Sequence, residues 1–329
     1  MKMIDNFSPF DRNILSDMIE RWLGPTPSAR LFSVFTDTSD FFEVEYGDVI
    51  LLKEHPYLIR NTEREGRFSI DDEPKFWVRR AIDLFDGSLK IIKLVFHERF
   101  VIRVGDLSFE CVRSPRKEAR ILDLIRGHRN FMQGTSVEDS AGNIIRIIDF
   151  IHGKTISDIV LELGKTHEEY FSVHFPAVLD DFIELVEAIR FLHLHGEKHG
   201  DIRRDHVIRD RQSGIYRWID FDFNYEHREK VFGFDLFGLG NILSYLVGRG
   251  DVTTQDLKTG NFPAFDRLTT DDLNIIFTNR VVNLKKIYPY IPDCLNRTLL
   301  HFSCGTHIYY DNTDQLLDDL QEVRAAHIR

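Results

Sequence analysis

Apolar and polar positions alternate along much of the first half of the chain, which is the pattern of half-buried strands. The segments that show this alternation are 57–60, 76–81, 89–95, 100–104, 108–112 and 143–148. The turn-forming pairs Asp86-Gly87 and Gly105-Asp106 separate neighbouring segments, so the sequence predicts two hairpins.

Apolar positions in the second half recur at helical spacing instead. The segment 176–196 carries one apolar stripe, and 235–247 is apolar nearly all round, which is typical of a helix buried within a domain. Three further helices are expected: one capped by Asp11 that ends before Gly24-Pro25, one that opens at Ser114-Pro115, and one at the C-terminal end. The predicted class is therefore α+β.

Composition narrows the class of protein without naming a function. Apolar residues make up 43% and charged residues 29% of the 329 positions, which is ordinary for a globular chain. The net charge of −11 argues against a non-specific nucleic-acid or anionic membrane surface. Three scattered cysteines and the lack of a signal sequence or membrane span predict a cytoplasmic protein with neither nucleic-acid nor membrane partners.

Two aspartates in the middle of the chain indicate phosphoryl transfer. His199-Gly200-Asp201 lies in a short loop, and Asp220 ends an apolar strand as part of Ile219-Asp220-Phe221-Asp222. One carboxylate in such an arrangement accepts the proton of an attacking hydroxyl. The other holds a divalent metal ion on nucleotide phosphates, because hard cations prefer carboxylate oxygens.

These motifs resemble those of the eukaryotic-like (Hanks-type) Ser/Thr protein kinases. His199-Gly200-Asp201 is similar to the catalytic-loop motif of that family, and Ile219-Asp220-Phe221-Asp222 is similar to its metal-binding motif. The resemblance covers roughly 57–325 and implies a two-lobed protein-kinase-like fold that binds ATP between the lobes. The implied organisation is an N-terminal helical extension at 1–46, a small β-rich N-lobe at 47–151 and a larger helical C-lobe at 152–329.

The resemblance also implies a role for individual residues. Lys93 would contact the α- and β-phosphates and pair with Glu118, while Asp201 would be the catalytic base. Arg203 would stand near the γ-phosphate, and Asp220 would bind the metal ion. The helix at 235–247 would brace the catalytic loop through Asp235.

Nucleotide contacts are expected in two further segments. Gly66 and Phe68 lie where the family has its glycine-rich loop, although only one of the usual glycines is present. Asp149 and Ile151 lie in the segment that resembles the hinge, where backbone groups would meet adenine.

The sequence departs from the family pattern at the metal site. His206 replaces an asparagine, and imidazole binds Mn²⁺ better than Mg²⁺, so the site either prefers Mn²⁺ or uses His206 for a hydrogen bond within the loop. Asp222 replaces a glycine and either adds a metal ligand or caps the next turn. Gly200 removes the arginine that senses a phosphorylated activation segment. The activation segment, from Asp220 to Asp235, is also short, and Tyr309 replaces a further arginine of the family pattern.

The predicted activity is ATP-dependent phosphorylation of a hydroxyl, with a Ser/Thr protein-kinase-like enzyme as the main interpretation. The short activation segment leaves open a small-molecule kinase related to the aminoglycoside and choline phosphotransferases. The altered glycine-rich loop and metal position leave open a nucleotide-binding pseudokinase scaffold. The acceptor, the metal preference, the oligomeric state and the regulation are not encoded in any motif.

Overall fold

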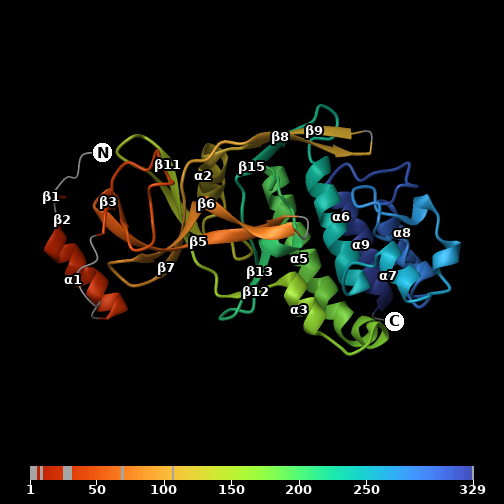
Figure 1. Ribbon diagram of the computed structural model, residues 1–329. Helices are drawn as coiled ribbons and strands as arrows, with labels where there is room; N and C mark the ends of the chain where they lie inside the picture. The colour runs from red at the N-terminus through yellow and green to blue at the C-terminus, as the bar shows by residue number, and fades with distance from the viewer. Residues whose placement is uncertain (1–5, 8–9, 25–31, 68–69, 106, 328–329) are drawn as a thin grey trace. The chain divides into compact units, whose positions relative to one another are not determined.

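The computed structural model describes residues 6–7, 10–24, 32–67, 70–105 and 107–327 (Figure 1). The chain divides into two compact units. The first unit comprises 1–97, 114–127 and 132–151, and the second comprises 98–113, 128–131 and 152–329. Strands dominate the first unit and most helices belong to the second, so the predicted α+β class is confirmed.

The first unit is built on a seven-stranded sheet. Its strands, in spatial order, are β10 (Gly134–Glu138), β11 (Ile144–Asp149), β7 (Leu89–Lys93), β6 (Ile70–Asp83), β5 (His55–Arg67), β4 (Val49–Leu52) and β3 (Val34–Phe35). Only β3 and β4 run parallel; the other pairs are antiparallel. The predicted Asp86-Gly87 turn joins β6 to β7, and Gly87 has the positive φ of 76° that such a turn requires.

Helix α1 (Arg12–Leu23) packs on this unit through one apolar side. Asp11 caps its N-terminus by accepting a hydrogen bond from the Ile14 N–H at 2.9 Å, as predicted. The buried residues of α1 belong to a core cluster that also contains residues of β4 and β5. Members of this cluster include Leu15, Met18, Ile19, Val49, Leu51 and Leu58. The indole of Trp22 also donates a hydrogen bond to the Leu84 carbonyl at 3.0 Å. Two short strands, β1 (Asn6–Phe7) and β2 (Phe10–Asp11), precede the helix.

Helix α2 (Pro115–Leu124) begins where the sequence predicts it. The Ser114 side chain accepts a hydrogen bond from the Lys117 N–H, and Pro115 occupies the first turn. The helix buries Glu118, Ala119, Ile121 and Leu122 and lies against β10 and β11. Its position therefore brings the carboxylate of Glu118 into the interior of the first unit.

The second unit contains two three-stranded sheets. One has the order β15 (Phe223–Glu226), β9 (Leu107–Arg113), β8 (Arg99–Val104), and the other has the order β12 (Gly153–Thr155), β13 (Val207–Asp210), β14 (Tyr216–Trp218). The predicted hairpin at Gly105-Asp106 joins β8 to β9, although Asp106 itself lies outside the described residues. The pairing of β9 with β15 places this hairpin beside the segment that follows Asp222.

Helices form the remainder of the second unit. They are α3 (Ile156–Glu162), α4 (His167–Glu169), α5 (Phe175–Leu194), α6 (Gly233–Gly248), α7 (Thr254–Thr259), α8 (Asp293–Leu300) and α9 (Thr313–His327). Short helical turns span Tyr170–His174, Arg204–His206, Phe265–Arg267, Thr270–Asp272 and Leu284–Lys286. Helix α6 is buried along most of its length, as predicted. Within the described part of the chain, no helix combines the length and apolar character needed to cross a bilayer.

Candidate active site

The first unit contains the ion pair expected between Lys93 and Glu118. The Lys93 Nζ lies 2.7 Å from the Glu118 Oε1, and the two side chains are 6% and 0% exposed. Lys93 ends β7 and Glu118 lies on α2, so the sheet and the helix each supply one partner. A buried lysine requires such a carboxylate, because removing one member of a buried pair typically costs about 3–5 kcal/mol.

A second buried cation, Arg146, shares the same carboxylate. Its Nε lies 3.1 Å from the Glu118 Oε2, and both side chains are fully buried. Arg146 lies on β11, directly opposite Lys93 in the antiparallel pairing of β11 with β7. Glu118 therefore binds one cation with each carboxylate oxygen.

The second unit contains the catalytic-loop motif, and Asp235 of α6 holds it in place. The backbone N–H groups of His199 and Gly200 donate to the two Asp235 carboxylate oxygens at 2.8 and 2.9 Å. The His193 Nε2 lies 3.0 Å from the Asp235 Oδ2. Burial alone would raise the pKa of this carboxyl, but the His193 hydrogen bond and charge and the other donors lower it below the ordinary value. The expected brace between α6 and the loop is thus present.

Close approach of α6 to the loop depends on Gly238. A Cβ at this position would lie 2.6 Å from the Ile202 Cβ and 2.8 Å from the Ile202 carbonyl oxygen. Any larger residue would therefore push the loop, including the adjacent Asp201, away from the helix.

His206 lies between the two aspartates that the sequence singles out. Its Nδ1 is 3.7 Å from the Asp201 Oδ2, and its Nε2 is 3.6 Å from the Asp220 Oδ2. The Nδ1 also lies 2.8 Å from the Asp201 backbone carbonyl, which can only accept, so Nδ1 carries the hydrogen. In the neutral ring the Nε2 lone pair is therefore the one that faces Asp220.

Asp220 itself has an uncommon backbone conformation. Its φ of 68° lies in the left-handed region, which aspartate tolerates better than most residues. The next residue, Phe221, is fully buried and packs against the rings of Phe131 and His199. This anchor fixes the position of the Asp220 carboxylate relative to the loop.

Asp222 forms a buried ion pair with Arg113. The Arg113 Nη1 lies 2.5 Å from the Asp222 Oδ2, with side-chain exposures of 1% and 0%. Burial alone would lower the pKa of Arg113, but the carboxylates of Asp222 and Asp220 raise it above its ordinary value. The guanidinium also lies over the ring of Phe223, 4.0 Å from its centroid. Asp222 thus has a structural partner, and metal binding by this residue stays a prediction.

Arg203 is turned toward a neighbour in the same loop. Its Nε lies 3.1 Å from the Asp205 Oδ1, and its Nη2 contacts the other carboxylate oxygen. Burial raises the pKa of Asp205, whereas His206 and Arg203 lower it, and the net result is a pKa below the ordinary value. A γ-phosphate would have to compete with Asp205 for this guanidinium.

The expected nucleotide-contact residues are spread over several elements. Gly66 lies near the end of β5, and Phe68 lies outside the described residues. Asp149 ends β11 and is exposed, with its Oδ1 2.7 Å from the Lys90 Nζ. Ile151 is half-buried just after β11. The adenine contacts of this segment therefore stay a prediction.

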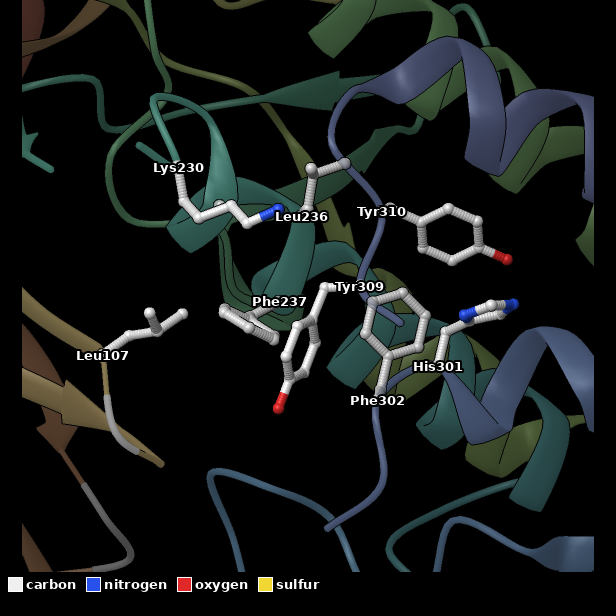
Figure 2. A pocket seen from close by; sticks show the side chains of 9 residues that line it. Leu107, Lys230, Leu236, Phe237, His301, Phe302, Tyr309 and Tyr310 are labelled. Carbon is white, nitrogen blue, oxygen red and sulfur yellow. The ribbon is translucent and has the colours of Figure 1, made fainter. Parts of the chain in front are cut away.

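Tyr309, which replaces an arginine of the family pattern, lies in a cluster of aromatic side chains. Figure 2 shows the rings of Phe302, Tyr309 and Tyr310 gathered near His301 around a cavity of about 10 Å³, room for about one water molecule. Lys230 of the activation segment lines the same cavity and forms an ion pair with Asp311, just before α9. This pair ties the activation segment to the C-terminal part of the second unit.

Clusters of three or more histidine, cysteine, aspartate or glutamate residues suited to a metal ion do not occur among the described residues. Asp220 supplies one carboxylate beside the His206 Nε2, and one or two carboxylates are enough where substrate phosphates and water complete the coordination. The residues present therefore fit a divalent metal ion that arrives with a nucleotide.

Comparison with known proteins gives partial matches to protein kinases. Putative sperm motility kinase W of Mus musculus is 27% identical over 139 residues, which cover 41% of this chain and 26% of the mouse protein. Putative ribosomal protein S6 kinase alpha-2 of Caenorhabditis elegans is 23% identical over 161 residues, or 48% of this chain and 18% of the worm protein. CDPK-related kinase 4 of Arabidopsis thaliana is 24% identical over 112 residues, or 33% and 18% of the two chains.

This chain is similar to protein kinases over about a third to a half of its length. It spans about a quarter or less of the length of these relatives. No family model matches the sequence. Among solved structures, the kinase domain of Mycobacterium tuberculosis PknI matches with 12% identity and a TM-score of 0.48, over 85% of this chain and 99% of that domain.

Two buried arginines of this kinase-like chain were missed by sequence reasoning. Arg146 interrupts the apolar run Ile144-Ile145-Arg146-Ile147-Ile148, and Arg113 follows the alternating segment 108–112. A charged residue within an otherwise apolar strand requires a buried partner, and this signal would have identified Arg146. Arg113 ends a strand and carries no comparable signal.

Proposed function

We propose that the chain is an ATP-dependent phosphotransferase that acts on a hydroxyl, as a Ser/Thr protein-kinase-like enzyme. The observation that carries this proposal is the position of His206 between the carboxylates of Asp201 and Asp220. It puts a candidate base and a candidate metal ligand within a few ångströms of one imidazole. The Lys93–Glu118 pair supports the same activity, because it supplies a positioned cation for the phosphates.

The proposed reaction uses the carboxylate of Asp201 as the base. The acceptor oxygen forms a bond to the γ-phosphorus of ATP, and the bond from that phosphorus to the β–γ bridging oxygen breaks. ADP leaves with the bonding electron pair, and Asp201 accepts the hydroxyl proton. The Asp201 side chain is 17% exposed, so a substrate hydroxyl has access to it.

Other residues of the chain hold the nucleotide in this proposal. Lys93 contacts the α- and β-phosphates while Glu118 keeps its ammonium in place. Arg203 exchanges its contact with Asp205 for the γ-phosphate, and backbone groups near Asp149 and Ile151 contact adenine. Gly66, near the end of β5, contacts the phosphates in this proposal, and so does Phe68.

Asp220 and His206 would hold the divalent metal ion. A bound metal ion neutralises the charge of the phosphates and orients them for in-line attack. An imidazole lone pair beside a carboxylate favours Mn²⁺ over Mg²⁺, because nitrogen ligands suit the softer ion. Asp222, which is paired with Arg113, would be a further ligand of the metal ion in this proposal.

The names of the relatives, which are all kinases and include a ribosomal protein S6 kinase, support a protein acceptor. We therefore propose a protein Ser/Thr hydroxyl as the acceptor and the cytoplasm as the location. The net charge of −11 argues against nucleic-acid and anionic-membrane partners.

The test is phosphoryl transfer by the purified chain. Labelled ATP is supplied with Mn²⁺ or Mg²⁺ and a panel of Ser/Thr peptides, and intact mass reports self-phosphorylation. We expect Mn²⁺-dependent transfer that falls by at least about 10³-fold in Asp201→Asn. Asp123→Asn is the matched control, because Asp123 lies exposed on α2 in an ion pair with Arg126.

Each other outcome separates the proposal from its competitors. Transfer to a small-metabolite panel but not to peptides would replace the acceptor class. ATP binding without transfer to peptide, metabolite or the chain itself would contradict the enzyme and identify a nucleotide-binding scaffold. Equal activity of Asp201→Asn and Asp123→Asn would remove Asp201 from the mechanism.

A further inference from the structure

Glu118 contacts a second buried cation in the first unit besides Lys93. Its Oε1 lies 2.7 Å from the Lys93 Nζ, and its Oε2 lies 3.1 Å from the Arg146 Nε. Both cations and the carboxylate are at least about nine-tenths buried. The geometry is therefore that of a shared buried carboxylate rather than a single ion pair.

Backbone contacts fix Arg146 independently of Lys93. Its Nη1 donates to the Ile144 carbonyl at 2.8 Å, and its Nη2 donates to the Leu94 carbonyl at 3.2 Å. Because the guanidinium is planar, these two bonds also set the direction in which its Nε–H points. That direction is toward Glu118, so β11 presents a fixed donor to α2.

The two cations also need Glu118 for electrostatic reasons. Arg146 and Lys93 occupy directly opposite positions in the pairing of β11 with β7. Like charges at opposite positions of a sheet repel one another, and the repulsion is stronger away from water. The carboxylate of α2 relieves it, so the sheet itself favours α2 in its observed position.

We propose that Arg146 is a positioning residue that holds Glu118 and α2 against the sheet, so that the Lys93–Glu118 pair is assembled before any nucleotide binds. The proposal rests on the proposed function for the role of Lys93, and it concerns regulation of that site. Movement of α2 would then not be used to form and break the Lys93–Glu118 pair in this chain. Gly200, which removes the arginine that senses a phosphorylated activation segment, is consistent with a site that needs no such trigger.

The test is amide hydrogen exchange of α2 (115–124) in the full chain without nucleotide. Arg146→Met removes the positive charge and the guanidinium donors and leaves an unbranched apolar side chain in their place. We expect at least about 10-fold faster exchange of the α2 amides in this variant than in the wild type. Saturating ATP with Mn²⁺ should restore part of the protection, because a ligand that binds the folded protein stabilises it.

Arg79→Met is the matched control. Arg79 is a buried arginine of the neighbouring strand β6, but it donates to Thr62 and the Phe41 carbonyl rather than to Glu118. We expect a lower melting temperature for this control with unchanged α2 exchange. Arg146→Lys keeps a cation and gives a second readout if Arg146→Met folds poorly, with exchange expected between the wild type and Arg146→Met.

Three results would overturn the role of Arg146: α2 exchange in Arg146→Met equal to wild type, equally fast exchange in the Arg79→Met control, or exchange in Arg146→Lys as fast as in Arg146→Met. The comparison without nucleotide does not depend on catalysis. Failure of the wild type to bind ATP would therefore contradict the proposed function alone.

Discussion

At the scale of single residues, three groups of the second unit carry the proposed chemistry. The Asp201 N–H donates to the His199 Nδ1 at 3.3 Å, and the buried ring of Phe221 anchors Asp220. His206 stands between the two aspartates. The hydrogen bond from Nδ1 to the Asp201 carbonyl fixes the ring and its tautomer. An asparagine at this position would offer an oxygen instead of an imidazole nitrogen.

In the proposed function, the identity of residue 206 therefore controls the metal preference. His206→Asn is expected to weaken Mn²⁺-dependent nucleotide binding by about 10-fold or more and to favour Mg²⁺ relative to the wild type. Calorimetric titration of ATP with each metal ion measures both effects. His195→Asn, a change of an exposed histidine at the end of α5, is the control. An unchanged metal preference in His206→Asn would show that this ring only supports the loop.

A second residue makes stability depend on pH. Burial raises the pKa of Asp181 on α5 to about 6. A raised carboxyl pKa stabilises the fold fully below the unfolded value of 3.8, and this contribution is lost as the pH rises through about 6. Asp181→Asn, which stays neutral, is therefore expected to raise the melting temperature at pH 7.5 by a few degrees and to change it little near pH 4.

Melting curves of Asp181→Asn at the two pH values test this sign directly. Asp180→Asn is the neighbouring control, because Asp180 is half-exposed in an ion pair with Arg324. An increase of the same size at both pH values, or in the control, would contradict the assignment to Asp181.

At the scale of elements, the β8–β9 hairpin secures the segment that follows Asp220. Strand β9 pairs with β15 from Phe223 to Glu226, and the Phe109 ring packs against Tyr225. Arg113 at the end of β9 neutralises Asp222, two residues after Asp220. The hairpin thus has a structural role that its sequence, two alternating strands and a turn, does not reveal.

Removing one partner of this pair should be costly. Arg113→Met is expected to lower the free energy of unfolding by about 3–5 kcal/mol, because Asp222 is left as a buried carboxylate without its cation. Addition of Asp222→Asn should recover a large part of the loss. Arg297→Met, which breaks an exposed pair with Glu322, should cost less than about 1 kcal/mol. Urea unfolding distinguishes these values, and equal losses in Arg113→Met and Arg297→Met would contradict the burial argument.

Most of these elements could be predicted from local sequence signals. The caps at Asp11 and Ser114, the turn at Asp86-Gly87 and the apolar helix α6 all use interactions between near neighbours in the chain. The short strands β10, β12 and β13 were not predicted, because a strand of three to five residues offers too little periodicity. The partners of Glu118 and Asp222 depend on strand register, which no local pattern encodes.

At the scale of the whole molecule, each unit carries one part of the proposed site. The first unit holds the Lys93–Glu118 pair, and the second holds Asp201, His206 and Asp220. The sequence resemblance rests on the order of these residues along the chain. Within each unit, the observed contacts agree with the residue pairs that the resemblance implied. The central claim of the proposed function is the prediction that residues of both units act on one ATP molecule.

An ATP analogue with a lysine-reactive acyl-phosphate group tests this claim most directly. Incubation of the full chain with the probe and Mn²⁺, followed by peptide mapping, should modify Lys93 in preference to the other lysines, and excess ATP should suppress the modification. Asp220→Asn should reduce the labelling of Lys93 by at least about 10-fold, although it changes only the second unit. Labelling of Lys93 that is insensitive to ATP and to Asp220→Asn would contradict the claim.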